Sequence, residues 1–220
     1  MSKLFTEAEC LSIVESASGR PFCSPPAVKT ESVQGLAALA GSGQARAIPQ
    51  VAALFVRSDS HYKTLGLDCY DFKRNALTWP GGSPGVYHPP CRAWGRYKTW
   101  AKPRHDEKDL ARWAMSSVRR FGGVLEHPAS SELWKEFHCS TYGLRDEFGG
   151  VLFPVMQSWF GHRAPKETAL YLVGSPIPDL SHVFTAELAS GRIENMGRAE
   201  RERTPAPFAE FLACLAAVCV

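Results

Sequence analysis

Apolar residues along this chain come in short runs, separated by stretches rich in polar residues, glycine and proline. Six of the runs predict β-strands, at residues 51–56, 67–71, 85–87, 124–128, 153–156 and 169–173. The run at 51–56 is apolar throughout, which is typical of a parallel strand buried on both faces. The next run ends in an acid, Asp71, and a polar loop joins the two.

Other stretches have the periodicity of helices. Between residues 106 and 121 apolar side chains recur every three or four positions, and two glycines follow. An apolar stretch predicts a closing helix at 207–218, and a capping-box pattern at 6–9 predicts a short helix over 6–16. Strands that alternate with helices favour an α/β fold over an all-β fold.

The first 48 residues differ from the rest of the chain. Helix-breaking residues at 19–26 are followed by a segment of small residues at 36–43. A chain of 220 residues suits one domain with an appendage, and it is long enough to bury a sizeable core. We therefore expect an N-terminal accessory arm at residues 1–48 and a single α/β domain at 49–220.

Composition narrows the classes of protein that fit. The chain is 45% hydrophobic and 21% charged, as is ordinary for a globular protein, and no run approaches the roughly 18 apolar residues of a membrane span. The first residues turn acidic too early for a signal peptide, so we expect a cytoplasmic protein without a membrane partner. Seven cysteines without a CxxC pair favour reduced thiols over a zinc ribbon.

The most informative stretch is His88-Pro89-Pro90-Cys91, directly after a predicted strand. Two prolines stiffen the backbone and hold the following cysteine at the carboxyl end of that strand, the edge where open α/β sheets bind ligands. Basic residues follow Cys91 at positions 92 and 96, and nearby positive charge lowers the pKa of a thiol. Cys91 is a candidate nucleophile; the alternative is a stiff turn with a small buried side chain.

Basic and aromatic residues are interleaved just beyond this cysteine. Phosphates need cations and bases need aromatic faces, so this mixture suits a polynucleotide groove. A solvated loop whose aromatic residues pack against the protein fits the pattern equally well. The formal net charge of the chain, +3, is too small to establish nucleic-acid binding by itself. The residues of this stretch are Arg92, Trp94, Arg96, Tyr97, Lys98, Trp100, Lys102 and Arg104.

Loops after several predicted strands would meet on one edge of a doubly wound sheet. Glu126 lies near the end of one strand and precedes His-Pro; beside a thiolate it could act as an acid or bind a heterocycle nitrogen. Otherwise it caps a helix or pairs with a surface arginine. Gln157 and His162 could read base edges or satisfy a strand edge, and for His162 and Thr168 we favour the structural role.

Four segments, in this order, resemble the DNA cytosine-5 methyltransferase superfamily, and most closely its short, phage-type branch. Residues 85–91 resemble its apolar strand with His-Pro-Pro-Cys, and 125–128 resemble its Glu-Asn-Pro motif with His127 in place of Asn. Residues 157–172 resemble its Gln-Pro-Trp-x-Phe-Gly-His segment and the strand beyond it. Residues 201–205 resemble its C-terminal Arg-Ser-Arg-Thr, so that the match spans about residues 51–215.

The resemblance implies a Rossmann-like, methyltransferase-type sheet with helices on both faces. It implies that Cys91 adds to C6 of a pyrimidine while Glu126 holds N3 and the exocyclic amine, on a base that has left the DNA stack. S-adenosylmethionine would be the cofactor, and DNA the partner, in a phage or prophage protein of a bacterial host. The cofactor residues expected are Ser58, Asp59, Ser60, Tyr62, Asp71 and His88. The nucleic-acid residues expected are Arg92, Arg96, Lys98, Lys102, Gln157 and Arg203.

One segment departs from the family pattern. The superfamily has a glycine-rich cofactor loop after its first strand, whereas this chain has no glycine between residues 57 and 65. Bulky His61 and Tyr62 would obstruct the close approach that glycines allow. The cofactor is therefore bound differently, or it is another molecule, or methyl transfer has been lost. The usual target-recognition domain is also missing, so sequence specificity would be low or supplied by a protein partner.

Three hypotheses follow from these observations. The first is a DNA-base-modifying enzyme that resembles the cytosine-5 methyltransferases. The second is an inactive nucleic-acid-binding or inhibitory protein on the same fold, and the loss of the glycine loop favours it. The third is a zinc site built from His88, Cys91, His138 and Cys139, because the His-x-x-Cys spacing suits zinc. Adjacent ligands such as His138 and Cys139 rarely reach one ion, so our predicted site contains no metal.

Overall fold

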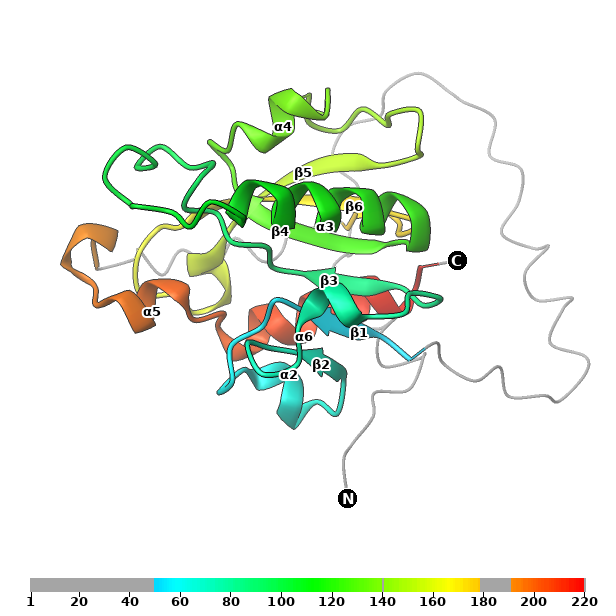
Figure 1. Ribbon diagram of the computed structural model, residues 1–220, viewed down its shortest axis with the longest axis horizontal. Helices are drawn as coiled ribbons and strands as arrows, with labels where there is room; N and C mark the ends of the chain where they lie inside the picture. The colour runs from blue at the N-terminus through cyan, green and yellow to red at the C-terminus, as the bar shows by residue number, and fades with distance from the viewer. Residues whose placement is uncertain (1–49, 140, 179–190, 220) are drawn as a thin grey trace, which may run out of the picture.

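The computed structural model describes residues 50–139, 141–178 and 191–219. Within them the chain forms an α/β fold built on one mixed six-stranded sheet, with strand order β2-β1-β3-β4-β6-β5 (Figure 1). The predicted accessory arm at 1–48 and its helix at 6–16 lie outside the described residues. The strands are β1 (Ala52–Leu54), β2 (Asp68–Tyr70), β3 (Gly85–Tyr87), β4 (Gly123–Pro128), β5 (Val151–Met156) and β6 (Glu167–Val173).

Each of the six strands predicted from the sequence is present; β3 has the predicted bounds, and the ends of the other five are shifted. The first four strands are parallel to one another, and β6 runs antiparallel to both of its neighbours, β4 and β5. The first strand is shorter than its apolar run because Phe55 has a φ of 61°, a left-handed conformation that is uncommon for a residue with a side chain. The expected loop after it contains a short helix, α2 (His61–Thr64).

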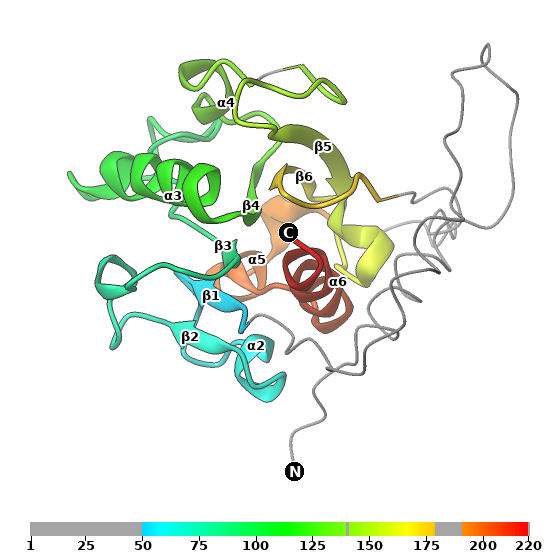
Figure 2. The ribbon, with the colours of Figure 1, turned by 90° about the vertical axis from the view of Figure 1, so that its right-hand side faces the viewer.

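Two helices cover opposite faces of the sheet (Figure 2). On one face α3 (Glu107–Phe121) packs Ala114 and Met115 into a core with Leu54, and on the other α6 (Ala206–Ala217) packs Phe208 against Ala53. Side chains of a strand alternate between its two faces, so neighbouring residues of β1 enter different cores. Both helices lie within about one residue of their predicted bounds, the first predicted from periodicity and the second from an apolar stretch.

The remaining elements are short and lie in the connections between strands. They are η4 (Ala76–Thr78), α4 (Leu133–Glu136), η5 (Gln157–Phe160), η6 (Ile193–Asn195) and α5 (Arg198–Glu202). Among the described residues, no helix has the length and apolar character that a membrane crossing needs.

A close approach between two glycines fixes the register of the central strands. Gly123 begins β4 with a φ of 114° and pairs with Gly85 at the start of β3. A Cβ atom at residue 123 would lie 2.0 Å from the Gly85 carbonyl oxygen, so only glycine fits. This register pairs Tyr87 with Leu125, and the next residues along each strand are His88 and Glu126.

Candidate active site

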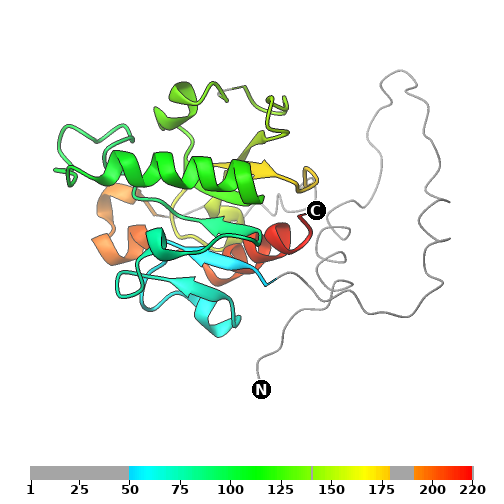
Figure 3. The same ribbon diagram turned by 45° about the vertical axis from the view of Figure 1, so that its right-hand side comes forward.

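A cleft of about 1600 Å³ lies at the carboxyl ends of β1, β3 and β4. The loop after β1 and the residues after β3 line one part of it, and the start of β6 lines another. Two further segments line its rim: the loop from β3 to α3, and residues 191–206, which contain α5. Figure 3 shows the β3–α3 loop and α5 at the same end of the molecule. Parallel strands end at the same edge, so the fold brings these distant segments together, as the sequence predicts.

Glu126 lies in this cleft as an ionised carboxylate. Its side chain is only 12% exposed, and its Oε2 accepts a hydrogen bond from His88 Nδ1 at 2.9 Å. Its Oε1 accepts another from Gln157 Nε2 at 3.0 Å. Desolvation alone would raise the pKa of Glu126, but the bond from His88 and the charge of Lys166 lower it to about 2.

His88 also contacts the loop after β1. Its Nε2 lies 2.9 Å from the hydroxyl of Tyr62, a fully buried side chain whose pKa burial raises well above the ordinary value. Because an ionised Glu126 can only accept, His88 Nδ1 is the donor of their hydrogen bond, and the Tyr62 hydroxyl is the partner of the other ring nitrogen. A continuous chain of hydrogen bonds therefore runs from Tyr62 through His88 to Glu126.

Gln157 supports Glu126 from behind rather than facing the cleft. Its side chain is buried, and its Nε2 donates to Thr168 Oγ1 at 3.0 Å as well as to Glu126. This residue was expected among the nucleic-acid contacts, but its amide is used inside the protein. The structural role favoured for Thr168 agrees with this geometry. His162 is also buried, and its Nδ1 lies 2.7 Å from the Ala164 carbonyl oxygen.

Cys91 lines the same cleft as Glu126 and is exposed to solvent. Its carbonyl oxygen accepts from the backbone N–H groups of Trp94 and Gly95, so a tight turn follows the two prolines. Although solvent reaches the residue, surrounding protein desolvates the thiol, and its pKa is raised by this desolvation and by the charge of Glu126, against the opposing charge of Lys166.

The prediction that flanking arginines activate this thiol is wrong. Arg92 pairs with the buried Glu107 instead, and the pKa of Cys91 is raised rather than lowered. In the free protein the sulfur is therefore a thiol. Any nucleophilic role of Cys91 requires that its proton leave when a substrate binds.

His127, at the position where the motif of the resemblance has Asn, is a buried residue of the cleft lining. Its Nδ1 lies 2.8 Å from Ser131 Oγ, which also accepts the backbone N–H of Leu133. Its Nε2 has no partner of hydrogen-bond geometry within the described chain, although the Pro90 carbonyl lies near enough to raise its pKa slightly. Desolvation nevertheless lowers the pKa of His127 to about 4, so the ring is neutral.

The loop after β1, expected to hold a cofactor, is bonded into the protein by its own side chains. Ser60 caps α2 by accepting from the Tyr62 backbone N–H, and His61 Nε2 lies 3.0 Å from Glu210 of α6. Asp59 pairs with Arg57 and with Arg203. Asp59, Ser60 and Tyr62 line the cleft, whereas Ser58 does not.

Asp71, the other expected cofactor residue, lies outside the cleft at the end of β2. Its Oδ2 accepts from Lys63 Nζ at 2.6 Å, and its Oδ1 accepts from the backbone N–H groups of Lys73 and Arg74. These bonds, with Lys63 first, lower the pKa of Asp71 to about 2. The groups that would hold a nucleoside cofactor are already bonded to protein, so these residues do not fit S-adenosylmethionine in the way that the resemblance implies.

The expected nucleic-acid residues separate into two groups. Arg92, Lys98 and Arg203 line the cleft but pair with acids: Arg92 with Glu107, Lys98 with Glu132, and Arg203 with Asp59. Arg96 lines the cleft and has no acidic partner within the described residues, whereas Lys102 lies outside the cleft lining. Of the expected nucleic-acid residues that line the cleft, Arg96 is therefore the cation without an acidic partner among the described residues.

The zinc hypothesis is not supported by the fold. His88 and Cys91 line the cleft, whereas His138 borders a separate pocket beside Arg119, and Cys139 is buried against Trp134. In the part of the chain that the structure describes, no group of three or more His, Cys, Asp and Glu side chains could hold a metal ion.

Sequence reasoning gave no role to several residues of the cleft. Lys166, at the start of β6, carries the charge that acts on both Glu126 and Cys91. Lys166 lies two residues before Thr168, within the motif segment predicted at 157–172. This position could have identified it from the sequence. Phe55 lines the cleft with a left-handed backbone, a conformation that costs of order 1–3 kcal/mol and is concentrated at functional sites.

Comparisons of the chain with protein-family models, with curated proteins and with solved structures find no match. The function must be argued from the cleft itself. Its central features are one ionised carboxylate held by two donors and one exposed thiol on the adjoining strand end.

Proposed function

We propose that this protein activates a pyrimidine base of a nucleic acid at C5, with Cys91 adding reversibly to C6 of the ring and Glu126 holding its N3 edge. The observation that carries the proposal is the placement of both groups in one cleft, with Glu126 ionised by His88, Gln157 and Lys166. A carboxylate has about four acceptor positions, and two of these are occupied. The others can accept from N3–H and from the exocyclic amine.

The addition needs only groups of the chain and of the base itself. The sulfur of Cys91 bonds to C6, the C5–C6 double bond shifts toward C4, and the thiol proton passes to N3. Glu126 then accepts the new N3–H, so negative charge never accumulates on the ring. The protonated base also offsets the carboxylate charge that raises the pKa of Cys91 in the free protein. Loss of the thiol proton is thereby coupled to binding.

The adduct makes C5 electron-rich, so that C5 takes up a proton from water. Loss of the original C5 hydrogen and expulsion of the sulfur restore the base, with the N3 proton returning to the thiol. This exchange needs only Cys91 and Glu126 and does not involve S-adenosylmethionine. The side chains of Tyr62, Lys63 and Asp71 are bonded to other groups of the protein.

The fold is compatible with this proposal. Four parallel strands with a cleft at their carboxyl ends are the arrangement of Rossmann-like domains, and α3 and α6 cover the two faces. We take the domain to be of the methyltransferase type that the motifs imply, with residues 1–48 as its accessory arm.

Release of tritium from C5 tests the addition independently of any donor. A cytosine oligonucleotide tritiated at C5 is incubated with the protein, with Cys91→Ser and with Cys69→Ser. Cys69 is a matched control, because it is a partly buried thiol on β2 outside the cleft. We expect tritium in water with the wild type and with Cys69→Ser, and at least a 100-fold slower release with Cys91→Ser.

A second function, nucleic-acid binding without catalysis, is favoured by two observations. They are the raised pKa of the Cys91 thiol and the hydrogen bonds that tie the loop after β1 to the rest of the protein. Oligonucleotide binding by the wild type, with no tritium release at any pH between 6 and 9, would support this function and contradict the first.

A further inference from the structure

Two aromatic side chains stand exposed on the rim of the cleft. Trp100 is 75% exposed and Tyr97 is 48% exposed, and their ring centroids lie 6.3 Å apart. Both belong to the loop from β3 to α3, and both line the cleft. Trp94 of the same loop is fully buried, with Lys108 of α3 over its ring, and so it anchors the loop to the domain.

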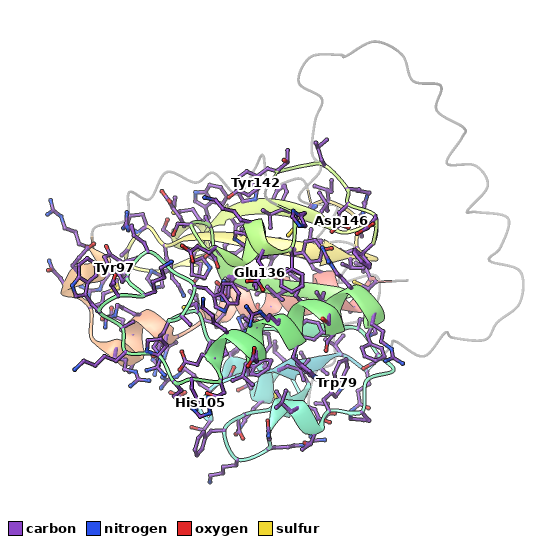
Figure 4. All side chains as sticks on the ribbon, turned by 45° about the horizontal axis from the view of Figure 1, so that its top comes forward. Trp79, Tyr97, His105, Glu136, Tyr142 and Asp146 are labelled. Carbon is purple, nitrogen blue, oxygen red and sulfur yellow. The ribbon has the colours of Figure 1, made fainter. Side chains whose placement is uncertain are left out.

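The aromatic pair lies next to the opposite rim. The Tyr97 hydroxyl lies 3.4 Å from Glu194 in the segment that contains η6 and α5, and Figure 4 shows Tyr97 at this end of the molecule. The guanidinium of Arg96 lies 5.0 Å from the centre of the Tyr97 ring. Two large apolar rings and a cation therefore face solvent together at the mouth of the cleft.

Positive charge is concentrated in the same cleft. Of the described residues that line it, ten are Lys or Arg and six are Asp or Glu, a formal excess of four positive charges. The whole chain carries a formal charge of only +3. Several of the lining cations pair with acids, but Arg96, Arg192 and Arg201 are exposed and have no acidic partner among the described residues. An anionic ligand would neutralise them.

The depth of the carboxylate that would hold the base favours an unpaired strand over a duplex. The side chains of Glu126 and His88 are only 12% and 11% exposed, so a base must leave its partner to reach them. Exposed aromatic faces bind unpaired bases by stacking, whereas the bases of a duplex already stack on one another. The cleft, at about 1600 Å³, also exceeds the roughly 300–1000 Å³ of a small-molecule site.

We propose that the cleft receives a single-stranded nucleic acid, with bases stacked on Trp100 and Tyr97 and phosphates on Arg96, Arg192 and Arg201. This inference deepens the proposed function, and it rests on that function for the base that enters the cleft. The stacked bases flank the base that reaches Glu126. Stacking on a ring tolerates any base, so the preference is for strandedness and not for sequence.

Fluorescence anisotropy of a labelled 12-nucleotide mixed-sequence DNA, free and annealed to its complement, tests the proposal with the full chain. We expect the single strand to bind at least 10-fold more tightly than the duplex. Trp100→Ala should weaken single-strand binding by about 10-fold, within the range for one base stacked on an aromatic ring. Phe72→Ala is the matched control, because Phe72 is 92% exposed but does not line the cleft, and it should change nothing.

The proposal is overturned if the duplex binds as tightly as the single strand. It is also overturned if Trp100→Ala, shown by circular dichroism to be folded, binds as the wild type does. Cys91→Ser separates the two proposals, because it should bind single strands normally while failing to release tritium. If the protein releases tritium but binds single strands and duplexes equally, the result would support the proposed function and contradict the proposal of a single-stranded ligand.

Discussion

The two halves of the strand edge differ in what their side chains face. At the ends of β3 and β4, Cys91 and Glu126 line the cleft, and Glu126 keeps acceptor positions that no protein group uses. At the end of β2, Asp71 bonds to Lys63 of α2, and both residues lie outside the cleft. Both carboxyls nevertheless have a pKa of about 2. A depressed pKa does not therefore distinguish a reactive carboxylate from a structural one; access to the cleft and free acceptor positions do.

The largest difference between Glu126 and Asp71 should appear when each carboxylate is replaced by its amide. In Glu126→Gln the N3–H of the base loses its charged acceptor, so tritium release should fall by at least about 100-fold, as when one group that stabilises a reacting charge is removed. In Asp71→Asn, release should stay within about twofold of the wild type. Initial rates of tritium release, measured on both variants at pH 7.5, check this. Equal losses in the two variants would contradict the separation.

Acid stability should respond to both replacements. The folded-state pKa of each carboxyl, about 2, lies below its ordinary value near 4. Each therefore contributes stability that is complete above about pH 4.5 and is lost as the pH falls toward 2. Thermal melts between pH 5 and 2.5 should consequently show a shallower decline for Asp71→Asn and for Glu126→Gln than for the wild type. This result verifies that both carboxylates are ionised in the folded protein.

A pair of tyrosines tests whether the loop after β1 contributes to the site. Tyr62→Phe removes the hydroxyl that bonds to His88, which then holds Glu126 less firmly, so release should slow by about 10-fold with little change in substrate affinity. Tyr70→Phe is the matched control, since the Tyr70 hydroxyl accepts from Arg74 beyond the cleft. Saturation curves for the two variants separate the rate from the affinity. An unchanged rate in Tyr62→Phe would show that the loop has no part in positioning.

Short, strongly patterned segments made most of the fold predictable. The glycine-bounded strand at 85–87 and the helix beginning near residue 106 follow directly from apolar spacing and breakers. The meeting of Cys91 with Glu126 was predictable as well, because parallel strands end at one edge. The antiparallel placement of β6 between β4 and β5 was not, since the order of strands in a sheet depends on long-range pairing that leaves no local pattern.

The partners of individual polar groups were the least predictable part of the site. Arg92 follows Cys91 in sequence, yet its charge goes to Glu107, fifteen residues away on α3. Tyr62 had been expected to contact a cofactor, but the fold turns its hydroxyl to His88. Such choices depend on side-chain directions in three dimensions, and residues adjacent in sequence often point to different elements.

The last prediction concerns His127, the buried neighbour of Glu126 on β4. Its pKa of about 4 lies below the ordinary 6.5, so the unfolded chain binds more protons between these values, and stability falls as the pH drops through that window. His127→Asn should remove this loss, worth up to about 2 kcal/mol between pH 7 and pH 5, without changing tritium release at pH 7.5. Urea unfolding at both pH values measures it, with the exposed His105→Asn as the control. The same pH dependence in wild type and His127→Asn would mean that His127 is not held neutral in the folded protein.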